Sequence, residues 1–247
     1  MQKKKTIHLE NIVEIIGPTG VGKTTIMNEL LKERNETDVW IYAPDLIKRY
    51  CGSLLKPSNW KFLVSQRFHR NNPNFKKEFY KHHNKFIDKD SWYIKKKRAY
   101  EFYQKYSEFQ SVFEIYQQKE NIKWPVCVVE ESMIYRTFTR TGLNMNDSSL
   151  IRLAKSFPLP KTVIYLDAPA EVIAERAYYR KKTPPVHYAL NKNEIQNTAQ
   201  IQKKHFDKLL FFLVNLDVTV HIISVEKGAV KSAQNIQELL EEISINK

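Results

Sequence analysis

The chain has 247 residues, of which 42% are hydrophobic and 27% are charged. These values are typical of one large α/β domain with a sizeable core, and no apolar run approaches the roughly 18 residues that a membrane span needs. The two cysteines, Cys51 and Cys127, have neither metal-ligand spacing nor a disulfide framework. We therefore expect a cytoplasmic protein without membrane segments.

The charge is strongly positive. Forty Lys and Arg residues against 27 Asp and Glu residues give a formal net charge of +13. A positive surface steers anions, so the excess fits an anionic small-molecule substrate. The excess is scattered along the chain rather than confined to one tail, so an ordinary solvated surface explains it equally well.

Five short apolar runs predict β-strands, and helical stretches separate them. In chain order they are Leu9–Ile16, Asp38–Ala43, Pro125–Glu130, Thr162–Asp167 and Val218–Ser224. Apolar strands of this kind suit a parallel sheet that is buried on both faces. Their alternation with helices predicts a three-layer α/β sandwich with a five-stranded parallel sheet and right-handed crossovers. We predict a single domain over 1–247, with its core at 7–43 and 125–247.

The first predicted strand leads into Gly17 to Thr24, which reads GPTGVGKT. This is the phosphate-loop pattern G-x-x-x-x-G-K-[ST], placed between an apolar strand and an amphipathic helix from Thr24 to about Glu33. Three of the chain's six glycines lie within these eight positions, where the backbone must approach phosphate. The loop predicts binding of a nucleoside triphosphate.

The predicted ligands are ATP and Mg²⁺, held by backbone N–H groups and the start of the helix. Lys23 is expected to bridge the β- and γ-phosphates, and the Thr24 hydroxyl to bind Mg²⁺. The predicted nucleotide-binding residues are Gly17, Thr19, Gly20, Val21, Gly22, Lys23, Thr24, Thr25 and, further along the chain, Arg176.

Asp45 follows the second predicted strand in the run IYAPDL. A carboxylate within reach of an attacking oxygen can act as a general base. Asp also commonly caps the N-terminus of a helix. Both roles stay open for Asp45.

The segment 44–124 is too long for a short crossover, and we predict a helical insertion on the acceptor side. From Phe75 to Tyr116 lysines and aromatic residues interleave at spacings of three and four, which suits amphipathic helices. The aromatic side chains would then pack inward while the lysines face water. The same interleaving could instead form a surface that binds nucleic-acid strands.

The third predicted strand ends in Glu130-Glu131-Ser132. An acid after four apolar residues occupies a Walker B position and can bind Mg²⁺ directly or through water. Thr24 and Glu130 are therefore the predicted metal ligands. An ordinary acid at the end of a strand is the alternative interpretation of Glu130.

The fourth predicted strand continues into VIYLDAPAEVIAERAYYRKK. The part from Ala170 to Arg180 predicts a helix, with Arg176 and Arg180 four residues apart on one face. Together with Lys181 and Lys182 they would belong to a lid at about 176–190 and clamp a transferring phosphoryl group. A solvated basic helix end is the alternative.

These motifs together resemble the thymidylate kinase and deoxynucleoside kinase group of phosphate-loop kinases. The resemblance covers the phosphate loop, the five strands and the run from Leu-Asp-Ala-Pro through Glu-Arg to the basic cluster. It implies a sheet of order 2-3-1-4-5 and lid arginines that reach over the phosphates. It also implies that Ser224 to Lys227 contact the adenine, and that the protein is a candidate homodimer.

The resemblance extends to the acceptor side. Asp45 matches the carboxylate that takes the proton from the acceptor hydroxyl in deoxynucleoside kinases. Arg67, in FLVSQR, is similar to an acceptor-site arginine of thymidylate kinases, which can pair bidentately with a phosphate. Glu131 departs from the pattern, because an arginine is usual there; Arg136 or Arg140 could supply the charge.

We therefore expect an ATP-dependent phosphotransferase that acts on a small acceptor, most simply a nucleoside or nucleoside monophosphate. The predicted catalytic residues are Lys23, Asp45, Glu130, Arg176 and Arg180. The predicted acceptor-binding residues are Asp45, Arg67, Glu131 and Arg136. The alternatives are a kinase of a sugar or other metabolite hydroxyl, a polynucleotide 5′-kinase, and a regulatory nucleotide-binding protein.

Overall fold

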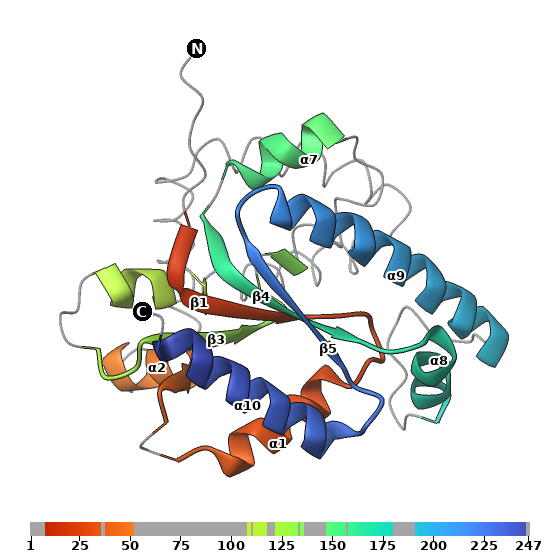
Figure 1. Cartoon of the computed structure of the whole chain (residues 1–247), viewed down its shortest axis with the longest axis horizontal. Coiled ribbons are helices and arrows are strands. Elements are labelled where there is room, and N and C mark those ends of the chain that lie inside the picture. The colour runs from red at the N-terminus through yellow and green to blue at the C-terminus, as the bar shows by residue number, and fades with distance from the viewer. Residues whose placement is uncertain are drawn as a thin grey trace, which may run out of the picture. The chain divides into compact units, whose positions relative to one another are not determined.

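The computed structural model describes residues 8–35, 38–51, 108–109, 111–117, 122–132, 134–135, 147–156, 158–179 and 191–245. They form a five-stranded parallel sheet of order β2-β3-β1-β4-β5 with helices around it (Figure 1). This confirms the predicted fold class and strand order. The chain divides into two compact units, Met1–Glu14 with Ile41–Lys161 and Ile15–Trp40 with Thr162–Lys247.

All five predicted strands are present. They are β1 His8–Ile16, β2 Trp40–Tyr42, β3 Val126–Glu130, β4 Leu159–Asp167 and β5 Thr219–Ser224. The helices are α1 Lys23–Glu33, α2 Ala43–Cys51, α7 Asp147–Ala154, α8 Ala170–Tyr178, α9 Lys192–Val214 and α10 Ala229–Ile245. None of the helices in the described part of the chain is long and apolar enough to cross a bilayer.

The strand β2 is shorter than predicted at both ends. Asp38 lies before the strand, and its Oδ2 accepts a hydrogen bond from the Asn35 N–H at 2.8 Å. Ala43 already belongs to α2, and Asp45 lies in the first turn of that helix rather than at its N-cap. Pro44 and Asp45 suit a helix start, since proline needs no N–H donor there and a carboxylate complements the helix dipole.

The strand β4 begins at Leu159, three residues before its predicted start. Its Cα register against β5 runs from Thr162 opposite Thr219 to Asp167 opposite Ser224. The first residues of β4 therefore precede the part that pairs with β5. Pro160 can lie there because its missing N–H removes no bond to β5.

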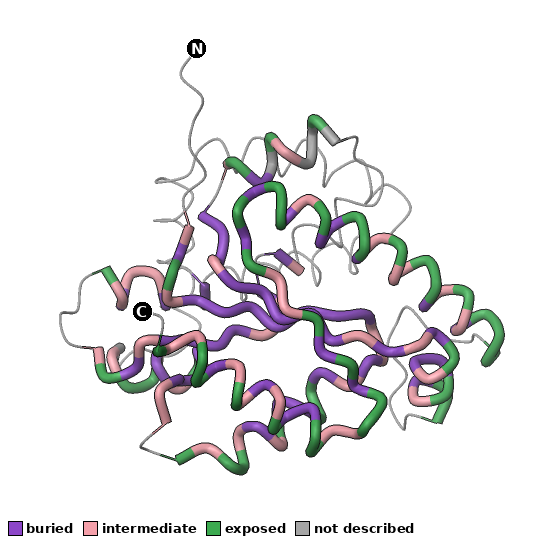
Figure 2. The backbone as a smooth tube through the Cα atoms, in the orientation of Figure 1, coloured by how far each residue is buried: buried purple, intermediate pink, exposed green. Residues whose placement is uncertain are grey.

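In the unit Ile15–Trp40 with Thr162–Lys247, helices lie on both faces of β4 and β5 (Figure 1). The helix α1 packs against α10, α8 packs against α9, and both α9 and α10 contact β5. The residues between these elements are mostly apolar, and the purple stretches of the tube in Figure 2 show where the chain is buried. This core positions the carboxyl end of β4 and the loop that follows β1.

In the unit Met1–Glu14 with Ile41–Lys161, Val126 to Val129 of β3 are fully buried and β3 contacts α2. Residues 108–109 and 111–117 of the predicted insertion are helical. Phe109 is buried, as the inward-packing interpretation expects. Arg67 and the rest of the run of lysines and aromatic residues before 108 lie outside the described residues, and so does the predicted nucleic-acid surface.

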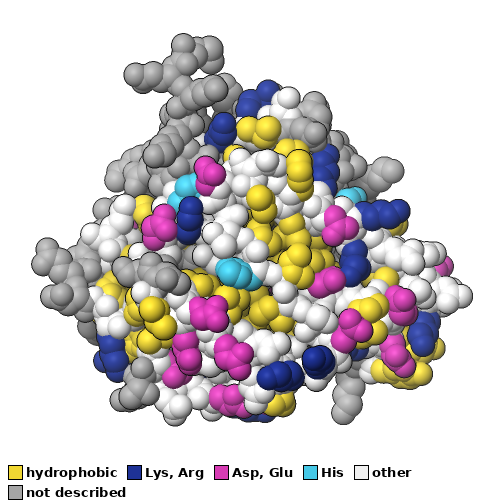
Figure 3. Space-filling view, in the orientation of Figure 1, with side chains coloured by type: hydrophobic (Ala, Val, Ile, Leu, Met, Phe, Trp, Pro, Cys, Tyr) yellow, Lys and Arg dark blue, Asp and Glu magenta, His cyan; other side chains and the backbone are white. Residues whose placement is uncertain are grey.

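The positive charge does not gather on the face shown in Figure 3. Basic and acidic side chains are interspersed there among the residues that the structure describes. This agrees with the scattered distribution of charge along the sequence.

Candidate functional site

The loop between β1 and α1 has a backbone that requires glycine. Gly20 and Gly22 have φ angles of +94° and +103°, in the left-handed region that other residues rarely adopt. Gly17 is constrained by space instead, because a Cβ there would lie 2.7 Å from the Leu166 carbonyl oxygen on β4. The loop geometry thus explains the three glycines of the motif.

The helix α1 starts in a way that favours an anion. Gly22 occupies its N-cap, no side chain caps the helix, and its first turn carries no acidic residue. The N–H groups at a helix start have no partner within the helix, and the dipole is positive there. Thr24 and Thr25 are exposed in this first turn. The residues present therefore fit a bound triphosphate.

Lys23 lies within the loop itself. Its side chain is buried, and Nζ donates hydrogen bonds to the carbonyl oxygens of Gly17 and Pro18, both at 2.8 Å. A buried ammonium needs negative or polar partners close by. These contacts hold the positive charge in the loop that the sequence assigns to phosphate binding.

Arg176, on α8, connects two segments of the candidate nucleotide site. Its Nη1 donates to the Val21 carbonyl oxygen and its Nη2 to the Val225 carbonyl oxygen, both at 3.0 Å. Val21 is part of the phosphate loop, and Val225 follows β5. Arg176 therefore lies beside the phosphate loop, while its part in neutralising phosphate charge stays a prediction.

The helix predicted from Ala170 to Arg180 is two residues too long. The helix α8 ends at Tyr178, and the Tyr179 N–H bonds back to the Glu175 carbonyl oxygen at 3.2 Å. That Arg176 and Arg180 share a helix face stays a prediction. Arg180, Lys181, Lys182 and the rest of the predicted lid to 190 lie outside the described residues.

The helix α9 contributes a contact that no sequence motif marks. Gln202 Oε1 accepts a hydrogen bond from the Thr19 N–H at 2.9 Å. From α8, Ile173 borders the neighbouring residue, since a Cβ on Gly20 would lie 3.1 Å from Ile173 Cγ2. The tip of the phosphate loop is thus held by α8 and α9.

The start of α9 did have a signal in the sequence. Asn191 and Glu194 form a capping box, in which each side chain accepts the backbone N–H of the other residue. The spacing Asn-x-x-Glu before an apolar periodicity is close to the known pattern for a helix start. It predicts the helix but not the contact of Gln202 with the loop.

We expect Gln202→Leu to weaken ATP binding about tenfold, since a lost hydrogen bond to a loop amide costs roughly 1–1.5 kcal/mol. Titration with a fluorescent ATP analogue measures the change. Gln200→Leu, at an exposed position of α9, is the control and should bind like the wild type. Equal affinities for Gln202→Leu and the wild type would show that α9 does not set the loop geometry.

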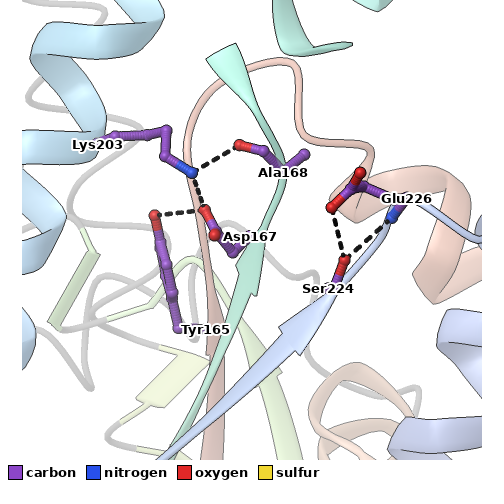
Figure 4. Close-up of polar contacts among 6 residues, drawn as sticks. All are labelled: Tyr165, Asp167, Ala168, Lys203, Ser224 and Glu226. Carbon is purple, nitrogen blue, oxygen red and sulfur yellow. Dashed lines mark hydrogen bonds and ion pairs between the residues drawn. The ribbon is translucent and has the colours of Figure 1, made fainter.

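The carboxyl end of β4 is tied to α9 by an ion pair. Asp167 Oδ1 pairs with Lys203, whose Nζ also donates to the Ala168 carbonyl oxygen at 2.7 Å (Figure 4). The Tyr165 hydroxyl donates to the same carboxylate oxygen at 3.4 Å. Burial and then the charge of Asp167 raise the pKa of Tyr165 well above its ordinary value, so this hydroxyl stays a donor.

The segment after β5 is held by its own backbone contacts. The Val225 N–H donates to the Asp167 carbonyl oxygen at 2.9 Å, and the Gly228 N–H donates to the Val225 carbonyl oxygen at 3.3 Å. The Ser224 hydroxyl donates to Glu226 Oε1 at 3.3 Å (Figure 4). These contacts give the segment a defined position, and its contact with adenine stays a prediction.

In the unit Met1–Glu14 with Ile41–Lys161, two predicted catalytic acids act on the same tyrosine. Burial raises the pKa of Tyr42, at the end of β2, well above its ordinary value, and the negative charges of Glu130, Glu108 and Asp45 add to the effect. Like an ordinary tyrosine, Tyr42 is protonated at neutral pH, and the raised pKa keeps its hydroxyl a hydrogen-bond donor at higher pH as well. The charges of Glu130, Asp45 and Glu108 thus all act on Tyr42, and no motif marked Glu108.

Glu131 has an unusual backbone. Its φ of +45° lies in the left-handed region, which a residue with a side chain adopts at a cost. The predicted charge replacements Arg136 and Arg140 lie outside the described residues, as does Arg67.

Within the described residues, no three His, Cys, Asp or Glu side chains gather closely enough to hold a metal ion. Mg²⁺ bound with a nucleotide typically takes one or two protein ligands, with phosphate oxygens and water completing its coordination. The small predicted set of Thr24 and Glu130 is compatible with that chemistry.

No protein-family model matches the chain, and no curated protein matches it. Among solved structures, the chain is similar to shikimate kinase from Bacteroides thetaiotaomicron, at 14% identity and a TM-score of 0.42 over 93% of this chain and 98% of that one. It is also similar to deoxyadenosine kinase from M. mycoides, at 15% identity and a TM-score of 0.49 over 94% and 99%. These likenesses concern the fold alone, which the strand order already establishes.

Proposed function

We propose that the protein is a phosphotransferase that moves the γ-phosphoryl group of ATP to a small acceptor. The observation that carries the proposal is the phosphate loop, with left-handed Gly20 and Gly22, a buried Lys23 and an uncapped helix start. In this proposal the loop N–H groups and Lys23 hold the phosphates. Thr24 and Glu130 hold Mg²⁺, which offsets phosphate charge.

The acids around Tyr42 support a hydroxyl as the acceptor. In the proposed step the acceptor hydroxyl oxygen bonds to the γ-phosphorus, the bond from this phosphorus to the bridging oxygen breaks, and ADP leaves. Asp45 takes the proton of the hydroxyl. Tyr42 is protonated and so can donate a hydrogen bond to the acceptor.

Within the proposal the acceptor is a nucleoside or a nucleoside monophosphate, as the resemblance of the motifs to deoxynucleoside and thymidylate kinases implies.

A screen for acceptor-dependent ADP release tests the proposal. The panel contains nucleosides, nucleoside 5′-monophosphates, sugars and an oligonucleotide with a 5′-hydroxyl, each with ATP and Mg²⁺. We expect a nucleoside or a nucleoside 5′-monophosphate to raise ADP release at least tenfold above the water background, as a positioned acceptor does. If ATP binds and no acceptor exceeds the background, the transferase proposal fails and regulatory nucleotide binding replaces it.

A further inference from the structure

Glu14, two residues before the end of β1, is a carboxylate without solvent exposure. Its exposed fraction is 0%, as are those of the flanking Val13 and Ile15. Removing a carboxylate from water is costly unless hydrogen bonds or charges compensate. The sequence offers no explanation for an acid at this place in a buried strand.

The backbone after β3 provides the compensation. Glu14 Oε2 accepts the Ile134 N–H and Oε1 accepts the Tyr135 N–H, each at 3.0 Å. Ile134 and Tyr135 are helical, and each of their amides bonds to a different oxygen of the same carboxyl group. The two carboxylate oxygens thus fix two consecutive amides in space.

The amides that Glu14 holds follow the candidate acids closely in the chain. Glu130 ends β3, Glu131 follows with its left-handed backbone, and Ile134 comes three residues later. A left-handed residue other than glycine costs about 1 kcal/mol or more and persists only where its surroundings determine it. The anchoring of Ile134 and Tyr135 supplies such a constraint.

A second side chain of β1 holds the other end of β3. Asn11 Nδ2 donates to the Pro125 carbonyl oxygen at 2.8 Å, one residue before β3 begins at Val126. Asn11 and Glu14 thus contact the chain just before and just after β3. Both contacts lie within the unit Met1–Glu14 with Ile41–Lys161.

We infer that Glu14 is a positioning residue for Glu130 and Glu131. It acts through the backbone amides of Ile134 and Tyr135 and so restrains where these two carboxylates lie. The inference rests on the proposed function, in which Glu130 serves Mg²⁺ and Glu131 lies on the acceptor side. A carboxylate is required because it offers two acceptor oxygens, whereas glutamine would turn an amide NH₂ group toward one of the N–H groups.

The test compares Glu14→Gln with Glu10→Gln, which changes an exposed acid on the same strand. For Glu14→Gln we expect the Mg²⁺ concentration for half-maximal ADP release to rise about tenfold. Losing a residue that holds a metal ligand in place typically weakens metal binding by this factor or more. The Kd for ATP without Mg²⁺ should stay within about twofold of wild type, because the phosphate loop is unchanged. Glu10→Gln should match the wild type in both measurements.

Amide hydrogen exchange of the metal-free wild-type protein tests the inference independently. This measurement requires neither enzymatic activity nor that the Glu14→Gln variant folds. The Ile134 and Tyr135 amides should exchange as slowly as those of β3. Fast exchange of both amides would overturn the inference, as would a Glu14→Gln protein whose only change is a lower melting temperature. If the wild type is active and either of these two results is found, only the positioning role of Glu14 is refuted, and the proposed function stands. A wild type that releases no ADP with any acceptor removes the proposed function and this inference with it.

Discussion

Lys23→Ala should reduce acceptor-dependent ADP release about 1,000-fold, the range seen when one preorganised charge or donor is removed from a transition state. The ammonium that is lost lies within the phosphate loop, bonded to the Gly17 and Pro18 carbonyl oxygens. Steady-state kinetics with saturating acceptor measure the effect.

Two further variants separate charge from packing in this experiment. Lys23→Met keeps most of the buried aliphatic stem and removes only the charge, so it should be as inactive as Lys23→Ala. Lys32→Ala removes an exposed lysine from the same helix, where its partner is Glu29, and should keep wild-type activity. Activity of Lys23→Met within about tenfold of wild type would contradict the assigned role of the ammonium.

Gly17→Ala should have the second large effect, on both folding and nucleotide binding. The new Cβ would lie 2.7 Å from the Leu166 carbonyl oxygen and 3.2 Å from Val21 Cγ1, so the backbone of the loop has to move. Overpacking of this kind costs about 1–3 kcal/mol of the free energy of unfolding. Urea denaturation measures this loss, and we expect ATP binding to weaken at least about a hundredfold, in line with the cost of small misplacements in such sites.

Gly228→Ala provides the matched control. Gly228 has a φ of +92°, and a Cβ there would meet nothing within 4 Å. The substitution therefore adds backbone strain of about 1–2 kcal/mol but no collision. Its ATP affinity should fall far less than that of Gly17→Ala, because the added Cβ meets no atom of the phosphate loop. A Gly17→Ala protein that binds ATP as well as Gly228→Ala would show that the close approach to β4 does not matter for the loop.

The features predicted correctly from the sequence are those encoded locally. Five apolar runs predict the strands, and eight consecutive residues from Gly17 predict the loop between β1 and α1. The errors at the ends of β2 and α8 also have local causes, since Ala43 begins a helix and Tyr178 ends one. The local sequence pattern indicates which element forms, but it indicates less reliably the residue at which one element ends and the next begins.

The contacts that position the candidate site could not be predicted in this way. Gln202 and the Thr19 N–H are 183 residues apart in the chain, Arg176 and Val21 are 155 apart, and Glu14 and Ile134 are 120 apart. Each contact depends on how helices and strands pack, and a single sequence holds no periodicity that reports such pairs. Of these contacts, that of Glu14 was the easiest to anticipate from the sequence, because an acid inside a buried strand needs a partner.

The Arg176 contacts bear on attempts to change nucleotide preference. One guanidinium fixes the Val21 and Val225 carbonyl oxygens at equal distances, so the segment after β5 and the phosphate loop are mechanically joined. If Ser224 to Lys227 recognise the base, amino-acid substitutions there that change the preferred purine will also displace the phosphate-binding backbone. Base selectivity and triphosphate affinity would then evolve together, and a change of purine would need compensation in the loop.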